Sequence, residues 1–307
     1  MSASFASALN AARDAAASQH YPQGALYVLA TPIGNLADIS LRALHVLQLA
    51  DAIACEDTRH TQALLRAYGI DKAPAQWLAV HQHNEAAGAQ AVIERLRRGE
   101  RVAYASDAGT PAVSDPGARL VAAVRAAGLR IVPLPGASSV TAALSVAGAA
   151  GDESGFVFAG FLPAKAGERQ AAVARLAQET RAIVLLEAPH RIEALAAALA
   201  ALGARPVTVG RELTKQFEEV ATLACAELPG WLAADPQRRR GEFALVLHPA
   251  PHAPQPHEGL RVLGLLLAEL PVKSAVKLAA EITGASRNEL YDAALKTRST
   301  PGGSPPR

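Results

Sequence analysis

The sequence predicts an α/β protein with two sheet-containing domains and a small helical domain near its C-terminal end. Short apolar runs alternate along the chain with longer segments in which apolar residues recur with a helical period. This alternation favours parallel sheets covered by helices. The 307 residues suffice for two domains and a small third one, and a hydrophobic content of 50% with only 4% aromatic residues predicts cores built mainly from Ala, Leu and Val.

Nearly every expected strand is followed by an unusual polar or glycine-proline loop. In chain order these are 26–30 with TPIGN, 52–55 with EDTRH, 76–80 with HQHNE, 102–105 with SDAGTPAVSDPG, 130–132 with PLPGASS, 156–159 with GFLPAK, 183–186 with EAPHR and 207–209 with GRELTK. Because loops that follow parallel strands emerge at one edge of a sheet, we expect this chemistry to gather at a single edge.

The loop SDAGTPAVSDPG, residues 106–117, carries the strongest of these signals. Gly109 allows a ligand to approach the backbone, and Pro111 and Pro116 restrict the loop. A rigid loop at the carboxyl end of a strand is where open α/β sheets bind small molecules. The alternative is an ordinary strand-to-helix connection, which does not require two glycines and two prolines.

The chain divides in this interpretation into six segments. We expect a flexible N-terminal tail at 1–24, α/β domains at 25–136 and 137–248, a proline-rich linker at 249–259, a helical domain at 260–298 and a disordered tail at 299–307. The second α/β domain closes with the apolar strand 243–247.

The expected helical domain has the layout of a helix-turn-helix. Its helices are expected at 260–270, 272–283 and 286–295, with Gly284 as a C-terminal cap. The second helix of such a unit often enters a nucleic-acid groove. The residues expected to meet phosphates are Lys273, Lys277, Arg287 and Arg298. A small packing or dimer-contact domain is the alternative.

Charge and cysteine content exclude several classes of protein. A net charge of +2 decides nothing about nucleic acid, and the basic clusters at 95–101 and 238–240 fit solvated faces. Cys55 and Cys225 have no CxxC or Cys/His ligand spacing, so we expect no metal site and no disulfide pattern. We also expect no membrane span and no secretory signal, and therefore a cytosolic protein.

Motifs from these loops occur together in a characteristic order. They are TPIGNLADIS, EDTRHT, HNE, SDAGTPAVSDPG, PLPG, GFLPAK, EAPHR, RELTK, GE before an apolar strand, and LPVKSAVKLAAEITG followed by NELY. The chain thereby resembles the ribosomal RNA small subunit methyltransferase I family of the tetrapyrrole methylase superfamily. The resemblance covers roughly 26–295 and leaves 1–24 without a counterpart. It implies two α/β domains of the tetrapyrrole methylase type with the cofactor cleft between them.

The resemblance also implies the reaction and the cofactor. The family transfers a methyl group from S-adenosylmethionine to the 2′-hydroxyl of a cytidine ribose in the decoding region of 16S rRNA, in the small ribosomal subunit, and we expect a homodimer. No GxGxxG follows the first strand, which fits a site unlike the Rossmann fingerprint. The residues that the resemblance places around the cofactor are Pro32, Ile33, Gly34, Asp107, Gly109, Thr110, Ala112, Val113, Gly136, Ser138, Leu162, Leu213, Gly241, Glu242 and Phe243.

Removal of the hydroxyl proton needs a base, because a ribose hydroxyl is a very weak acid. The ionisable candidates at the expected edge are Glu56, Asp57, Glu187, Glu212 and Lys215. Each could instead cap a helix or pair with a nearby arginine. We expect Asp57 and Arg59 to position the substrate, and Glu56 or Lys215 to take the proton.

Three other functions remain open at this point. A porphyrin-type C-methyltransferase of the same superfamily leaves the helical domain unexplained. A helix-turn-helix regulator that binds nucleic acid leaves the loop-rich edge unused. A ligand sensor without catalysis would not need the polar motifs EDTRH and RELTK.

Overall fold

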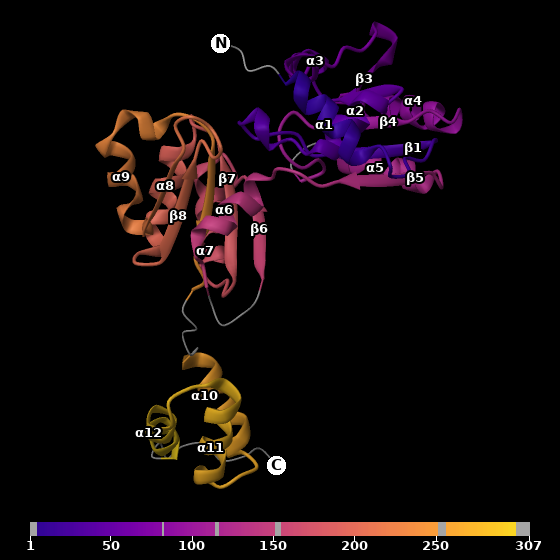
Figure 1. The fold of residues 1–307 in the computed structure, drawn as a ribbon. Helices are drawn as coiled ribbons and strands as arrows, with labels where there is room; N and C mark the ends of the chain where they lie inside the picture. The colour runs from indigo at the N-terminus through magenta and orange to yellow at the C-terminus, as the bar shows by residue number, and fades with distance from the viewer. Residues whose placement is uncertain (1–4, 82, 114–116, 151–154, 251–255, 299–307) are drawn as a thin grey trace. The chain divides into compact units, whose positions relative to one another are not determined.

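The computed structural model describes residues 5–81, 83–113, 117–150, 155–250 and 256–298, and its fold is drawn in Figure 1. The chain divides into two compact units, with the boundary between Pro249 and Ala250. The first unit contains two five-stranded sheets. The described part of the second unit contains three helices.

The first sheet is parallel throughout its described pairings, as the sequence predicts for this domain. Its strand order is β3-β2-β4-β1-β5. The strands are β1 (Ala25–Leu29), β2 (Ala52–Cys55), β3 (Trp77–Ala79), β4 (Val102–Ala105) and β5 (Arg130–Leu134). Every residue of β2 and β4 is buried, which is typical of parallel strands covered on both faces.

Helices cover both faces of this sheet because successive strand residues point to opposite sides. Tyr27 and Ile53 share a core with residues of helices α1, α2 and α3, whereas Leu26 and Tyr104 pack with α4 and α5. The helices are α1 (Ala6–Ala16), α2 (Leu41–Leu49), α3 (Thr58–Ala67), α4 (Glu85–Arg97) and α5 (Gly117–Ala126). Short 3₁₀ turns occur at Leu36–Asp38 and Pro74–Gln76.

The neighbours β1 and β4 form the switch point of the sheet. The chain leaves β1 toward β2 and leaves β4 toward β5, which lie on opposite sides of the pair. Such a point opens a crevice at the carboxyl ends of the two strands. The loops after β1 and β4 therefore meet where a ligand is expected.

The N-terminal segment is more ordered than the expected flexible tail. Helix α1 packs on α2 through small side chains, and Ala12 is fully buried. The hydroxyl of Tyr21 donates to the Ala16 carbonyl at 3.1 Å, and Phe5 lies edge-on to Tyr68. The expectation is wrong for 6–16, because alanines spaced four apart give a helix face that can approach a neighbour closely without a strong apolar signal. Residues 1–4 lie outside the described residues.

The second sheet is mixed, which corrects the expectation of parallel sheets throughout. Its order is β6-β7-β10-β8-β9, and β10 runs antiparallel to both β7 and β8. The strands are β6 (Phe156–Gly160), β7 (Ala182–Glu187), β8 (Pro206–Arg211), β9 (Glu219–Ala224) and β10 (Phe243–Leu247). Strand β9 escaped prediction because it is a partly exposed edge strand without a continuous apolar run.

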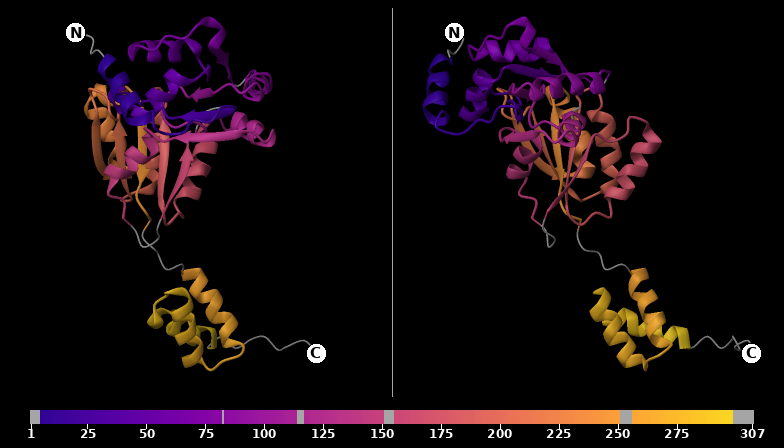
Figure 2. Two further views of the ribbon diagram at one scale, coloured as in Figure 1. Left: turned by 45° about the vertical axis from the view of Figure 1, so that its right-hand side comes forward. Right: turned by 90° about the vertical axis from the view of Figure 1, so that its right-hand side faces the viewer.

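Strands β6, β7 and β8 nevertheless remain parallel to one another. The loops after them emerge at the same edge, and β10 begins there with Phe243 paired to Arg211 and Glu187. Helices α7 (Ala166–Leu176), α8 (Ile192–Leu199) and α9 (Leu228–Ala234) contribute to the core on one face. Helix α6 (Ser139–Ala147) packs on the other. Figure 2 shows the two sheets from further sides.

The second unit forms a core of its own. It contains α10 (Pro256–Leu267), α11 (Val272–Thr283) and α12 (Arg287–Arg298), which enclose residues such as Leu263, Val276 and Leu290. Gly284 ends α11 in the left-handed conformation, as predicted. Helix α10 begins inside the expected linker, of which 251–255 lie outside the described residues, as does the expected tail 299–307.

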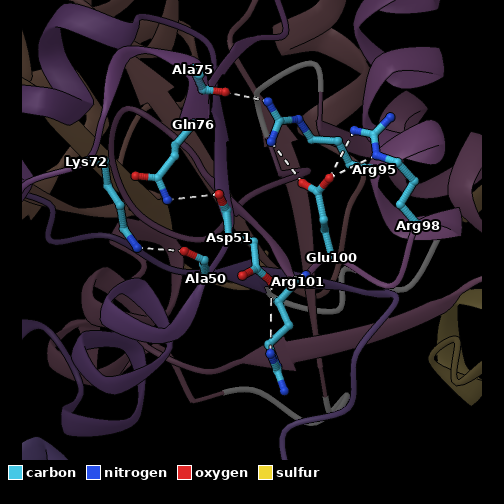
Figure 3. A network of polar contacts seen from close by, with 9 residues as sticks. All are labelled: Ala50, Asp51, Lys72, Ala75, Gln76, Arg95, Arg98, Glu100 and Arg101. Carbon is cyan, nitrogen blue, oxygen red and sulfur yellow. Dashed lines mark hydrogen bonds and ion pairs between the residues drawn. The ribbon is translucent and has the colours of Figure 1, made fainter.

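The basic cluster at 95–101 borders the amino ends of β2 and β4, whereas the unusual loops follow the carboxyl ends of the strands. Figure 3 shows its polar contacts. Arg95 and Arg98 both pair with Glu100, at 2.9 and 3.0 Å. The Arg101 backbone N–H donates to Asp51 at 2.7 Å. The contact of Arg101 links the starts of β2 and β4, and the pairs with Glu100 hold the end of α4 to the turn before β4. The Arg101 side chain also donates to the Tyr21 carbonyl at 3.1 Å, so three of the four arginines have a structural role.

Candidate functional site

The loops after β1 and β4 are joined by a two-residue antiparallel bridge. The Thr31 N–H donates to the Gly109 carbonyl at 3.0 Å, and the Gly109 N–H donates to the Thr31 carbonyl at 3.1 Å. The Thr31 and Ser106 hydroxyls donate to the carbonyls of Ser106 and Gly109. Gly109 has φ +78°, and a Cβ there would lie 3.1 Å from Cγ2 of Ile33. Only glycine fits this position without strain.

The loop after β5 closes against the same bridge. The Thr110 hydroxyl donates to the Ala137 carbonyl at 3.0 Å. A Cβ on Gly136 would stand 3.0 Å from the Cβ of Ala30, so glycine is required for this close approach. Three loops from consecutive strands of the sheet order β4-β1-β5 thus form one rigid edge.

Three cavities lie along this edge, and each has lining residues from more than one loop. The first encloses about 370 Å³ and is lined by Ile33, Ala108, Ser139, Phe161, Leu186, Glu187, Ala188, Pro189, Gly210, Leu213, Lys215, Glu242, Phe243 and Ala244. We call it the apolar cavity. The second, the polar cavity, encloses about 540 Å³ and is lined by Pro32, Ile33, Gly34, Leu36, His60, Ala63, Leu64, Ala67, Asp107, Ala108, Lys215 and Glu242. The third, the small cavity, encloses about 170 Å³ and is lined by Glu56, Ser106, Asp107, Ala108, Gly109, Thr110, Val113, Ser138, Ser139, Val140 and Leu186.

A lysine from the second sheet reaches the loop after β1 of the first sheet. Lys215 lies so close to Gly34 that a Cβ on that glycine would overlap its Cγ. Its ammonium donates to Glu212 at 2.7 Å and to Glu242 at 3.1 Å. The Asn35 N–H donates to the Thr214 hydroxyl at 3.2 Å. These contacts join the RELTK and TPIGN loops across the wall shared by the apolar and polar cavities.

The backbone of the RELTK loop is strained at two positions. Glu212 and Thr214 have φ values of +52° and +67°, which side-chain-bearing residues rarely adopt. Such strain persists only where surrounding contacts over-determine the conformation, and it concentrates at ligand sites. Here the salt bridges of Lys215 and the hydrogen bond of Thr214 hold the loop, so that Leu213 lines the apolar cavity.

The pairing of Lys215 argues against its expected role in removing a proton. Burial, the largest single cause, lowers the pKa of its ammonium, but the hydrogen bonds to Glu212 and Glu242 together with the charges of these two carboxylates raise the pKa. A lysine that stays protonated cannot accept a proton. Lys215 is therefore placed to hold the two loops together.

Asp57 and Arg59 pair with each other at the start of α3. The Asp57 carboxylate caps this helix by accepting from the Arg59 N–H at 2.8 Å, and it accepts from the guanidinium at 3.1 and 2.8 Å. These hydrogen bonds hold the pKa of Asp57 well below its ordinary value. The Arg59 side chain is 89% exposed and remains accessible to a partner.

Most of the expected cofactor residues line the three cavities. The exceptions are Ala112, Gly136, Leu162 and Gly241. Leu162 belongs to the core of the second sheet. A Cβ on Gly241 would overlap the Glu212 side chain, so a glycine at this position leaves room for the RELTK loop. Residues 114–116 of the SDAGTPAVSDPG loop lie outside the described residues.

Several lining residues were missed by the sequence reasoning. Ala108, Ser139 and Leu186 each line at least two cavities, and His60 lines the polar one. The signals were present, since these residues belong to or border the SDAGTP, PLPGASS, EAPHR and EDTRH motifs. The loop conformation decides which residues of a motif line a cavity, and the sequence of the motif does not specify that conformation.

The expected RNA-binding residues lie on the second unit. Lys273 and Lys277 are exposed and one turn apart on α11, so they share a helix face. Arg287 pairs with Glu281 at 3.2 Å. Arg298 ends α12, and its side chain lies outside the described residues.

Comparison with known proteins identifies both units. Residues 25–229 match the family model of tetrapyrrole (corrin/porphyrin) methylases, and residues 253–298 match the model described as the RsmI C-terminal HTH domain. No described helix has the length and apolar character needed to cross a membrane.

Relatives that are 46% and 49% identical to this chain indicate the family within the tetrapyrrole methylases. Ribosomal RNA small subunit methyltransferase I of Escherichia coli O157:H7 is 46% identical over 278 residues, which cover 89% of this chain and 96% of that protein. The protein of the same name from Neisseria meningitidis serogroup A / serotype 4A is 49% identical and covers 89% of this chain and 93% of its own length.

Solved structures agree at the level of the fold. Cobalt precorrin-4 methyltransferase has a TM-score of 0.52 at 20% identity, over 74% of this chain and 98% of its own. The methyltransferase CobJ has a TM-score of 0.54 at 18% identity, over 73% and 94%. The cofactor of the chain is S-adenosylmethionine, the methyl donor of these methylases. The chain belongs to the tetrapyrrole methylases and, within them, to the ribosomal RNA small subunit methyltransferase I family.

Proposed function

We propose that this protein methylates the 2′-hydroxyl of a cytidine ribose in the decoding region of 16S rRNA, within the small ribosomal subunit. The observation that carries the proposal is the wall common to the apolar and polar cavities, made by Ile33, Ala108, Lys215 and Glu242. Transfer of a methyl group requires the donor and the ribose to lie in adjoining sites, and two cavities that share a wall provide such an arrangement.

The residues around the apolar cavity fit an adenosine-containing cofactor. Leu213 and Phe243 can cover a flat base. We assign the cofactor to Pro32, Ile33, Gly34, Asp107, Gly109, Thr110, Val113, Ser138, Leu213, Glu242 and Phe243. Ala112, Gly136, Leu162 and Gly241 act in this proposal by supporting the walls from outside.

The substrate ribose occupies the part of the polar cavity lined by α3 residues such as His60 in this proposal, whereas Pro32 and Gly34 line the part next to the cofactor. When bound, the cofactor supplies a sulfonium methyl group, which is intrinsically ready for displacement. The protein must align the ribose oxygen with that methyl group, exclude water, and accept the hydroxyl proton. Arg59, exposed beside the polar cavity at the start of α3, positions the RNA backbone.

Glu56 is the group that we assign to proton removal. It follows β2 directly, is partly buried, and lines the small cavity, which shares the wall residues Asp107 and Ala108 with the polar cavity. The ribose O–H bond would break with the proton passing to the Glu56 carboxylate while the oxygen takes the methyl group. Asp57 and Lys215 are less suited, since the first is held ionised by Arg59 and the second is held protonated by Glu212 and Glu242.

The variant Glu56→Gln tests this assignment. We expect the rate of methyl transfer to fall by roughly 10²- to 10⁴-fold, the usual contribution of a general base, while the affinity for S-adenosylhomocysteine stays unchanged. A variant that keeps the parent rate would remove Glu56 from the chemistry, and loss of cofactor affinity would make it a binding residue.

The second unit docks the enzyme on ribosomal RNA in this proposal. Lys273, Lys277, Arg287 and Arg298 would contact phosphates, so that binding depends on salt. A protein ending at Ala250 should bind S-adenosylhomocysteine like the parent but methylate small subunits poorly at moderate salt. Lower salt should partly restore Lys277→Ala but not the shortened protein. Parent-like methylation by the shortened protein would contradict the docking role.

Transfer of a labelled methyl group tests the substrate. Small ribosomal subunits, free 16S RNA and a porphyrin precursor are offered side by side, and the labelled nucleoside is identified after digestion. We expect label on the cytidine 2′-oxygen, whereas label on the porphyrin carbon would establish the alternative reaction. We further propose that the enzyme acts as a homodimer in the cytoplasm, and sedimentation of the full chain measures its oligomeric state.

A further inference from the structure

Glu187 combines deep burial with an incomplete set of hydrogen bonds. It is the last residue of β7 and is only 2% exposed. Its Oε1 accepts from the Ala188 N–H at 2.9 Å and lies 3.1 Å from Nε of Arg191. Its Oε2 is buried and has no hydrogen-bond partner among the residues that the structure describes.

Such an oxygen is expensive to leave unsatisfied. A buried acceptor without a partner costs roughly 1–3 kcal/mol, and more when it carries charge. The strand end and the bond to Ala188 keep the carboxylate in place, so it does not reach solvent by rotating away. A ligand that brings a donor to this oxygen would remove the penalty, so the arrangement favours recognition of a donor.

The position of Glu187 identifies which site the donor enters. Glu187 lines the apolar cavity, together with its chain neighbours Leu186 and Ala188. It is absent from the described lining of the polar cavity, where the RNA ribose is proposed to bind. An acid that is 2% exposed meets a small molecule held inside the cavity rather than a nucleotide within a large RNA.

We infer that Oε2 of Glu187 accepts a hydrogen bond from a ribose hydroxyl of the adenosine moiety of the cofactor. The inference rests on the proposed cofactor position. An acidic side chain beyond the end of a strand is a common partner for adenosine ribose hydroxyls in nucleotide-binding α/β folds. The apolar side chains of Leu213 and Phe243 suit the base, which leaves the sugar for the carboxylate. Glu187 thus acts as a cofactor-positioning residue, whereas the sequence indicated it only as an ionisable candidate at this edge.

Binding of S-adenosylhomocysteine and of its 2′-deoxy and 3′-deoxy analogues tests the inference by calorimetry. Loss of a hydrogen bond to a charged acceptor should weaken binding of S-adenosylhomocysteine to Glu187→Ala by roughly 10- to 100-fold. The parent should lose a similar factor toward one deoxy analogue, and Glu187→Ala should show no further loss with that analogue. Glu193→Gln, an exposed carboxylate on α8 paired with Arg239, is the matched control and should bind like the parent.

Two further variants keep the outcomes distinguishable. Glu187→Gln retains the shape and the acceptor for Ala188, so it should fold even if Glu187→Ala does not, and thermal unfolding checks both. Leu213→Trp places a larger side chain in the apolar cavity and obstructs the proposed cofactor position. If Leu213→Trp binds S-adenosylhomocysteine like the parent, the proposed cofactor position fails. If Leu213→Trp loses binding but a folded Glu187→Ala binds like the parent, only the role of Glu187 is overturned. The same conclusion follows if Glu187→Ala loses the same factor of affinity for S-adenosylhomocysteine and for both deoxy analogues.

Discussion

Gly34→Ala should break the contact between the two sheets at the site. A Cβ at this position would overlap Cγ of Lys215 and would come within 3.0 Å of Cε and 3.1 Å of Cδ. The lysine cannot simply swing aside, because its ammonium is held by Glu212 and Glu242. Either the TPIGN loop must move, or Lys215 must give up its carboxylates.

Both responses lower the free energy of unfolding by a similar amount. Overpacking of this kind costs about 1–3 kcal/mol when the backbone has to shift. Release of Lys215 loses a hydrogen bond between charged groups to Glu212, about 1.5–3 kcal/mol. The contact with Glu242 adds little, because that side chain is 73% exposed. We therefore expect Gly34→Ala to lower the free energy of unfolding by about 1–3 kcal/mol.

A double-mutant cycle separates this explanation from a general intolerance of side chains in the loop. Lys215→Ala removes the three atoms that the new Cβ would meet, so Gly34→Ala should cost less than about 0.5 kcal/mol in that background. Urea unfolding measures the four proteins, and calorimetry with S-adenosylhomocysteine shows whether the cleft responds in parallel. Gly167→Ala in α7, where a Cβ would meet nothing within 4 Å, is the control and should be neutral or slightly stabilising. An equal loss with and without Lys215 would refute the reasoning.

Three other perturbations follow from the same structure. Gly109→Val places a β-branched residue at φ +78° and should reduce binding of S-adenosylhomocysteine strongly, as measured by calorimetry; unchanged affinity in a folded variant would remove this loop from the site. Burial, the largest single cause, raises the pKa of Glu212, but the hydrogen bonds from Lys215 and the Glu242 N–H together with the charges of Lys215 and Arg211 lower the pKa below the ordinary 4.5. The ionised Glu212 carboxylate therefore stabilises the folded state above pH 4.5, and this stabilisation is lost as the pH falls through the lowered pKa. The decrease of the urea midpoint in acid should therefore be smaller in Glu212→Gln than in the parent. Burial raises the pKa of both Cys55 and Cys225 to about 11, so a thiol reagent at mildly alkaline pH should label neither in the folded protein and both in urea; rapid labelling of the native state would contradict their burial.

The local pattern of the sequence determined most of the secondary structure and the loops from which the candidate site is built. Apolar runs such as 102–105 gave the strands of the first sheet, and helix α11 matches its predicted bounds of 272–283, with Gly284 as its cap. The loops after the strands were recognisable because glycine and proline restrict the backbone locally, whatever the rest of the fold does. Family motifs spread over nearly the whole chain then identified the family, which the relatives confirm.

Only the tertiary structure decided how the elements combine. The antiparallel insertion of β10 and the edge strand β9 depend on pairing between distant segments, and packing of α1 on α2 depends on small side chains with a weak periodic signal. The chemistry of the site has the same origin. Lys215 is a possible base in the sequence but a protonated link between two sheets in the fold, and the unsatisfied oxygen of Glu187 exists only because burial removes water from it. The ionisation and hydrogen bonding of a side chain depend on the residues around it in space, whereas a sequence motif specifies only its neighbours along the chain.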